Sequence, residues 1–192
     1  GGARLREPAA RVEDITHMPE RKLGKGRVAR LAERPRVEDD EVLAAISKTG
    51  RGKPLVAQAI GSAARGRPLP TRHVRPADFC AEPNRARLAK GGVHLQLMDR
   101  LRSIKPPIID DFLATPMETA SSVDPFEVLE AREGRRATMI ASRLGPNEWH
   151  LRTGGELIAD SILGRVASAC RHLDIDGPNM RKWIADNRPK RE

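Results

Sequence analysis

The residues best suited to chemistry lie in a short glycine-containing stretch, where Gly50, Gly52 and Lys53 follow an apolar run and precede a helix-like segment. Backbone N–H groups at such a turn and at a helix start point towards an anion, and the lysine adds a positive charge. The full phosphate-loop pattern is G-x-x-x-x-G-K-[ST]. Here Ser47 stands at the first glycine and Pro54 at the final hydroxyl position. Taken alone, this stretch fits either a phosphate site or an ordinary solvated glycine turn.

A second candidate is the pair of adjacent carboxylates, Asp110 and Asp111, that ends the apolar run in 104–112. A strand buried on both faces has a continuous apolar sequence, and open α/β sheets place functional groups at the C-terminal ends of such strands. Buried acids are unfavourable unless a metal or polar ligand engages them. The alternative is a turn that begins with aspartates, but the glycine–lysine stretch upstream favours a ligand site.

The apolar patterning predicts strands that alternate with helices. Strands are expected at 42–46, 69–74, 104–112, 137–142 and 173–175, and helices at 26–32, 55–64, 93–104, 124–133, 156–171 and 178–187. Pro70 restricts the second strand to an edge or an irregular strand, because proline lacks a donor for the ladder. Asp124 followed by Pro125 is typical of a helix N-terminus, with the aspartate as N-cap. The alternation predicts an α/β fold with an open, mostly parallel sheet flanked by helices.

Charge and composition limit the class of protein. The 192 residues fit one globular domain, and the net charge of +9 favours a polyanionic partner, with nucleic acid ahead of a membrane surface. Residues 65–105 hold ten Lys/Arg against three Asp/Glu. This segment fits a DNA contact and a solvated basic face equally well. No apolar run approaches membrane-spanning length, and the two distant cysteines, Cys80 and Cys170, predict reduced thiols in a cytoplasmic protein.

Several segments, in this order along the chain, resemble those of the IstB family of transposition helper ATPases, which are AAA+ proteins related to the helicase loader DnaC. The resemblance covers 12–182, nearly the whole chain. It rests on V-E-D-I near the start, I-I-D-D-F as Walker B, A-T-M-I-A-S-R-L as the first sensor strand, W-H at 149–150, I-A-D-S-I-L-G-R-V at 158–166 and H-L-D-I-D-G-P-N-M-R-K at 172–182.

The resemblance implies a three-layer P-loop NTPase fold of the AAA+ type and a division of the chain into three parts. Residues 1–38 would form a basic, exposed N-terminal arm and lead-in, 39–178 the ATPase core, and 179–192 a basic C-terminal helix and tail. The small helical domain that such helpers carry ahead of the core is not recognisable. The implied partners are DNA, bound largely without sequence preference, a transposase and further copies of the same chain, with no membrane.

The resemblance also implies ATP and Mg²⁺ as cofactors and assigns a role to each candidate residue. The phosphates would be held by Gly50, Arg51, Gly52, Lys53 and Pro54. Asp110 would hold Mg²⁺ through water, and Asp111 would polarise the attacking water. Ser142 would act as first sensor, Arg165 as an arginine finger on a neighbouring subunit's nucleotide, and Arg181 as second sensor. Considered without the resemblance, both arginines fit simple surface exposure equally well.

Three departures from the family pattern bear on hydrolysis. Ser47 replaces a glycine that permits a tight turn. Pro54 lacks the Mg²⁺-ligating hydroxyl and an N–H, and it is expected to bias Lys53 away from helical geometry. Arg143 stands where the family has an uncharged amide. The first hypothesis is therefore an ATP-hydrolysing transposition helper. The alternatives are a non-hydrolysing DNA-binding assembly module with the same fold and a DnaC-like helicase loader.

Overall fold

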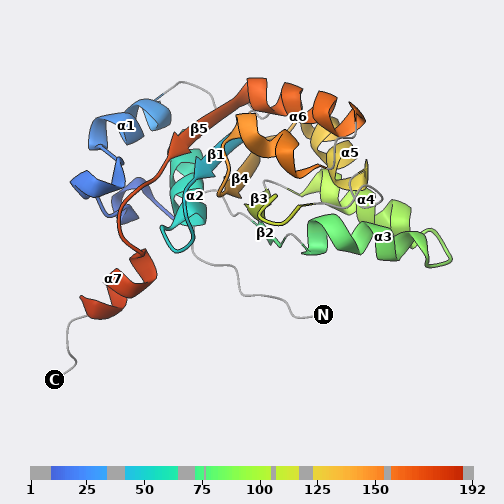
Figure 1. Cartoon of the computed structure of the whole chain (residues 1–192), viewed down its shortest axis with the longest axis horizontal. Helices are drawn as coiled ribbons and strands as arrows, with labels where there is room; N and C mark the ends of the chain where they lie inside the picture. Colours follow the sequence, from blue (N-terminus) through green and yellow to red (C-terminus); the bar gives the residue numbers. More distant parts are fainter. Residues whose placement is uncertain are drawn as a thin grey trace.

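The computed structural model describes residues 10–33, 42–64, 72–75, 77–104, 107–116, 123–153 and 157–187. Its centre is a five-stranded sheet in the order β2-β3-β4-β1-β5, in which every neighbouring pair is parallel (Figure 1). The strands are β1 Val42–Ile46, β2 Arg72–Val74, β3 Pro107–Phe112, β4 Thr138–Ser142 and β5 Cys170–Asp174. The expected parallel sheet is confirmed, and β2 lies at an edge, which is one of the two alternatives predicted from Pro70.

The helices connect these strands and cover both faces of the sheet. They are α1 Lys25–Glu33, α2 Lys53–Ala64, α3 Glu82–Arg87, α4 Val93–Ser103, α5 Val123–Arg132, α6 Leu157–Ala169 and α7 Met180–Asp186. Shorter turns are η1 Val12–Asp14, η2 Pro19–Arg21, η3 Ala77–Ala81 and η5 Pro146–Arg152. In Figure 1, α7 lies near the C-terminus, on the opposite side of the molecule from α3, α4 and α5.

Side chains of β1 alternate between two apolar clusters, one on each face of the sheet. Val42 and Ala44 pack with residues of α4, α5 and α6, whereas Leu43 and Ala45 pack with residues of α1 and α2. A strand with helices on both faces needs apolar residues at every position, and each residue of β1 is buried. The fold is therefore three layers, helix–sheet–helix, as the sequence predicted.

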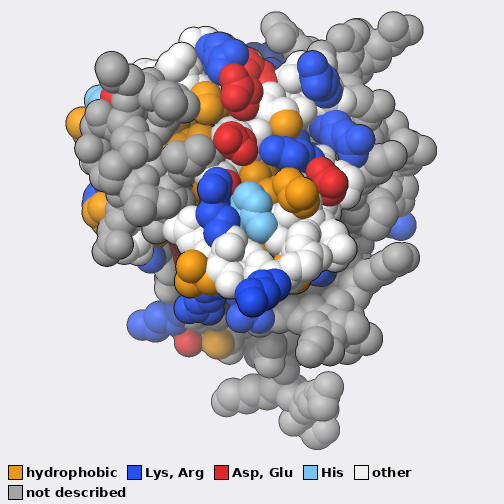
Figure 2. All heavy atoms as spheres, turned by 90° about the vertical axis from the view of Figure 1, so that its right-hand side faces the viewer, with side chains coloured by type: hydrophobic (Ala, Val, Ile, Leu, Met, Phe, Trp, Pro, Cys, Tyr) orange, Lys and Arg blue, Asp and Glu red, His pale blue; other side chains and the backbone are white. Residues whose placement is uncertain are grey.

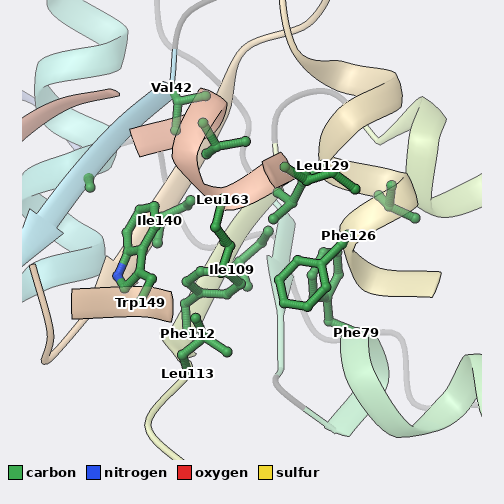
Figure 3. Close-up of a cluster of buried hydrophobic side chains, with 14 of the residues drawn as sticks. Val42, Phe79, Ile109, Phe112, Leu113, Phe126, Leu129, Ile140, Trp149 and Leu163 are labelled. Atoms are coloured by element: carbon green, nitrogen blue, oxygen red, sulfur yellow. The ribbon is translucent and has the colours of Figure 1, made fainter. Parts of the chain in front are cut away.

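The first cluster anchors the ends of the two strands that lead to the candidate site (Figure 3). The rings of Phe112 and Trp149 meet edge to face, with centroids 5.1 Å apart and an interplanar angle of 85°. Trp149 also donates a 3.0 Å hydrogen bond from its ring N–H to the carbonyl of Leu144. These contacts fix the segment after Asp111 and the segment after Ser142 against each other.

The expectation of an exposed N-terminal arm is wrong for the part of 1–38 that the structure describes. Ile15, Leu23 and Val28 are buried and belong to the cluster that contains Val56 and Ile60 of α2. Their spacing follows no helical or strand period, because most of this segment is short turns, so periodicity could not reveal them. The proposed boundary at residue 38 stays a prediction.

Two local expectations are also corrected. The helix expected at 156–171 ends at Ala169, and Cys170 begins β5, because this residue pairs with Val42 in the parallel ladder. Asp124 is not an N-cap: α5 begins at Val123, and the buried Asp124 carboxylate instead accepts hydrogen bonds from Arg87 and pairs with His94 Nε2 at 2.9 Å.

Among the described residues, no helix is both long enough and apolar enough to cross a membrane.

Candidate functional site

The glycine stretch forms a loop between β1 and α2. Gly50 and Gly52 have φ angles of +83° and +79°, in the left-handed region that favours glycine. A Cβ on Gly50 would lie 2.5 Å from Nδ2 of Asn179, so a side chain has no room there. The amide of Met180 donates a 2.7 Å hydrogen bond to the Gly50 carbonyl. The start of α7 therefore closes over the loop.

Lys53 is the first residue of α2, and only 4 % of its side chain is exposed. Its ammonium group donates a 3.1 Å hydrogen bond to the Ser47 carbonyl and lies 3.8 Å from Oδ1 of Asp111. Burial lowers the pKa of Lys53, and the charges of Asp111 and Asp110 oppose this shift. Pro54 does not keep Lys53 out of the helix, because the first turn of a helix tolerates proline.

Ser47 occupies its position without backbone strain. The left-handed non-glycine residues in the described part of the chain are Lys22, Asp111 and Leu113, and Ser47 is not one of them. Its hydroxyl donates to the Lys48 carbonyl at 2.9 Å, and its amide donates to Ser142 O at 3.0 Å. The loop therefore does not require a glycine at this position.

The two carboxylates stand where the regular pairing of β3 with β4 is interrupted, between Ile109 and Phe112. Asp111 has a φ of +45°, and its amide donates to Oδ1 of Asp110 at 3.0 Å. Such a conformation is uncommon outside glycine and occurs at functional sites. It directs the Asp111 carboxylate towards Lys53 and Arg143, whose Nε lies 3.7 Å from the same oxygen, Oδ1.

A cavity of about 210 Å³ brings most of these residues together. Seven of the ten predicted site residues line it: Gly50, Gly52, Lys53, Pro54, Asp110, Asp111 and Arg181. Sequence reasoning missed Thr49 of the loop and three polar residues that the N-terminal segment contributes to the wall, namely Asp14, Thr16 and Arg21. Nothing in the sequence separates Arg21 from the other arginines around it, since only its burial makes it unusual.

The other three predicted residues lie outside this lining. The fully buried Ser142 hydroxyl donates to the Phe112 carbonyl at 2.9 Å and accepts from the Leu144 amide at 3.1 Å. The Arg51 side chain pairs with Asp176. Arg165 pairs with Glu130 of α5 and lies 4.0 Å from a carboxylate oxygen of Glu133.

Comparison with known proteins shows the family of this chain. Residues 2–187 match the family described as IstB-like ATP binding protein. The chain belongs to this family. A protein of Sinorhizobium fredii, y4pL, is 30% identical over 181 residues, which cover 94% of this chain and 72% of that one. Its name describes an insertion sequence ATP-binding protein.

The solved structures that this chain resembles include DnaA and DnaC, which have the AAA+ P-loop NTPase fold. The DnaC helicase loader has a TM-score of 0.61 at 12% identity, and the match covers 88% of this chain and 97% of that one. The replication initiator DnaA, solved with AMPPCP and single-stranded DNA, has a TM-score of 0.66 at 15% identity, with coverage of 98% and 59%. At these identities the likeness shows the fold alone, so this IstB-family chain shares the fold of those proteins.

The residues of this IstB-family site fit the phosphate chain of ATP. The left-handed glycines, the buried Lys53 and the guanidinium groups of Arg21 and Arg181 offer donors and positive charge around one cavity. Asp110 offers a carboxylate of the kind that holds Mg²⁺ together with phosphate oxygens. Pro54 offers neither an N–H nor a hydroxyl, so the metal would have fewer ligands from this loop.

Proposed function

We propose that this protein binds Mg-ATP in the cavity between the glycine loop, Asp110–Asp111 and α7, and assists an insertion-sequence transposase on DNA. The observation that supports it most is the approach of the buried Lys53 ammonium to Asp111 Oδ1, at 3.8 Å beside the left-handed glycines. Phosphoryl transfer depends on positioning and charge neutralisation, which these groups can provide.

The roles of the chain's own residues follow from this placement. Gly50, Gly52 and Lys53 would bind the phosphates, and Arg181 would add charge from α7. Asp110 would hold the metal, which supplies charge neutralisation when bound, and Asp111 would orient the attacking water. Ser142 would act on the γ-phosphate side by holding the ends of β3 and β4, because its hydroxyl joins Phe112 to Leu144.

A titration with Mg-ATP tests this function directly. Binding should be measured by calorimetry for the parent, Lys53→Met and Asp111→Asn, and hydrolysis by phosphate release. We expect Lys53→Met to abolish binding and Asp111→Asn to bind ATP but lose turnover. Parent protein that binds Mg-ATP no better than Lys53→Met would refute the proposal.

A non-hydrolysing assembly module is the second candidate, and two observations favour it. Pro54 removes two groups that serve the metal and phosphate, and Arg143 competes for the Asp111 carboxylate at 3.7 Å. This candidate predicts that the parent binds nucleotide but does not hydrolyse it. Asp111→Asn should then release no less phosphate than the parent.

We also propose that α3 and α4 contact DNA. Arg85 of α3, Lys90 between the two helices and Arg100 of α4 are exposed and have no ion pair with a described residue. In the same segment, Leu88 and Leu95 are also exposed, by 89 % and 67 %. Figure 2 shows this end of the molecule, with Lys and Arg side chains beside apolar and acidic ones. Contacts of this kind to phosphates have little sequence preference.

Salt dependence tests the DNA proposal. Affinity for single-stranded and duplex DNA should fall with salt, with a log–log slope of about −0.7 to −0.9 per phosphate neutralised. Replacing Arg85, Lys90 and Arg100 by alanine should make the slope shallower, whereas Arg135→Ala, an exposed arginine after α5, should not. An affinity that stays constant from low to physiological salt would exclude this surface.

We further propose that the protein oligomerises and that Arg165 acts on a neighbouring subunit's nucleotide. Arg165 is half exposed, and its pairs with Glu130 and Glu133 hold it at the surface beside α5. Mixing Arg165→Ala chains with Lys53→Ala chains should restore part of the ATPase activity of a hydrolysing parent. A fully mixed oligomer without recovered activity would argue against this role.

A further inference from the structure

Arg21 is a buried cation in the wall of the nucleotide cavity. It ends η2, and only 2 % of its surface is exposed. Long charged side chains are rarely this buried unless a partner neutralises them. The cavity that Arg21 lines also contains Gly52 and Lys53 of the glycine loop.

Two main-chain carbonyls fix the orientation of the guanidinium group. Nη1 donates to Thr16 O and Nη2 to Arg51 O, both at 2.7 Å. On its other side lies Gly177, where a Cβ would come within 2.8 Å of Arg21 Cγ. The Arg21 carbonyl accepts a 2.9 Å hydrogen bond from the Asp176 amide. Arg21 is therefore held rigidly against the loop at Arg51.

The charge of Arg21 has no counter-ion among the described residues. Its Nε has no hydrogen-bond partner. Asp176 is engaged by Lys22 at 3.2 Å and by Arg51. Asp14 accepts a 2.7 Å hydrogen bond from the Arg11 amide. A buried charge without a partner is unfavourable, and burial lowers the pKa of Arg21.

We propose that Arg21 binds the phosphate chain of the nucleotide, at the part that the glycine loop cradles. This inference rests on the proposed nucleotide site. A Cβ on Gly52 would lie 3.6 Å from Arg21 Nη2, so the guanidinium group lies against the glycine loop itself. In phosphate loops the backbone cradles the α- and β-phosphates, and the lysine reaches further along the chain. Arg21 thus offers a charged donor that offsets the N–H missing at Pro54.

The experiment compares Arg21→Gln, which removes the charge, with Arg21→Lys, which keeps it. Affinities for ADP and pyrophosphate are measured by competition with a fluorescent ATP analogue. Because hydrogen bonds to charged groups are strong, Arg21→Gln should weaken both ligands about ten- to a hundredfold, and Arg21→Lys by less than about threefold. Arg30→Gln, an exposed arginine on α1, is the matched control and should change neither affinity.

Equal losses in the Gln and Lys variants would show that Arg21 only supports the loop, and unchanged affinity in Arg21→Gln would also overturn the inference. Circular dichroism checks folding. If Arg21→Gln does not fold, the inference is tested with Arg21→Lys. A loss of affinity in Arg21→Lys as large as that in Lys53→Met would overturn the inference. A parent that binds neither ligand refutes the nucleotide site itself, whereas loss in Lys53→Met but not in Arg21→Gln refutes only this inference.

Discussion

The Met180 amide and the Gly50 carbonyl are joined by a 2.7 Å hydrogen bond, which connects the first residue of α7 to the glycine loop. The neighbouring Asn179 caps α7 by accepting from the amides of Arg181 and Lys182. Its side chain also fills the space where Gly50 would carry a Cβ. The loop and the helix that presents Arg181 therefore hold each other in place, so a change in one should be felt by the other.

Gly50→Ala should weaken ATP binding because of this contact. Alanine in the left-handed conformation costs about 1 kcal/mol on backbone grounds, and the clash with Asn179 adds to that. Gly91→Ala is a matched control, since Gly91 has the same φ of +83° and a Cβ there would have no atom within 4 Å. Thermal unfolding and ATP affinity are measured for both. Adding Asn179→Ala should restore part of the loss in Gly50→Ala, and no restoration would mean that the clash is unimportant.

Pro54→Thr should raise the affinity for Mg-ATP. It restores an N–H and a hydroxyl in the first turn of α2, and a hydrogen bond to a charged group contributes about 1.5–3 kcal/mol, or roughly ten- to a hundredfold. Pro54→Val has nearly the same shape as Pro54→Thr but restores the N–H alone. Its affinity for ATP should therefore rise less, and Mg²⁺ should add little to it. Calorimetry with and without Mg²⁺ distinguishes them. Ser47→Gly should add nothing, because Ser47 is not in a left-handed conformation.

Arg143→Asn should increase ATP hydrolysis. The substitution removes the cation 3.7 Å from Asp111 Oδ1 and leaves Lys53, at 3.8 Å, as the cation beside that oxygen, so the carboxylate is more available to orient water. An ion pair between partly exposed groups contributes up to about 1 kcal/mol, so the rate should rise by up to about fivefold. Arg135→Asn controls for the loss of one positive charge. Unchanged turnover in Arg143→Asn, with Arg135→Asn also unchanged, would show that Arg143 does not restrain Asp111.

Arg132→Met should destabilise the fold strongly. The buried guanidinium donates to the carbonyls of Arg102 and Ile104 at the end of α4, to Ala137 O and to the Thr138 hydroxyl. Burial lowers its pKa to about 10, so it stays charged at neutral pH. Removing it leaves several acceptors unsatisfied, and we expect a loss of about 3 kcal/mol in the free energy of unfolding. Urea titration of Arg136→Met, an exposed neighbour, should show a change below about 0.5 kcal/mol.

Asp124→Asn should remove a pH-dependent contribution to stability, because the Asp124 carboxylate of α5 bonds to Arg87 of α3 and His94 of α4. The hydrogen bond from Arg87 and, after it, that from His94 hold the pKa of Asp124 below its usual value of 3.8, although burial opposes them. A carboxylate whose pKa is lower in the folded state than in the unfolded state stabilises the fold at pH values above its unfolded-state pKa. This stabilisation is lost as the pH falls through the folded-state pKa. The stability difference between the parent and Asp124→Asn should thus be largest near pH 7 and shrink below about pH 4. Asp186→Asn, an exposed carboxylate, should show no such trend.

The sequence predicted the sheet well because apolar runs and glycine turns are local signals. All five strands and the loop at Gly50–Lys53 follow from residues that are close in the chain. It could not predict the wall made by Asp14, Thr16 and Arg21, since what makes them part of the site is a tertiary contact with the loop. Asp124 shows the opposite error: its local helix-start pattern was clear, but pairing with the distant Arg87 determined its role.

The contacts of Arg21 and Met180 with the glycine loop also have a consequence for how the protein folds during synthesis. Arg21 holds the loop from one side, and Met180 holds it from the other, so the site is complete only when both ends of the described chain are in place. During synthesis the loop and Lys53 leave the ribosome more than a hundred residues before α7 does. Domains acquire their contacts as the chain emerges, at about 5–20 residues per second. Nucleotide capture should therefore be one of the last events of folding, and it would mark a chain that has been translated through α7.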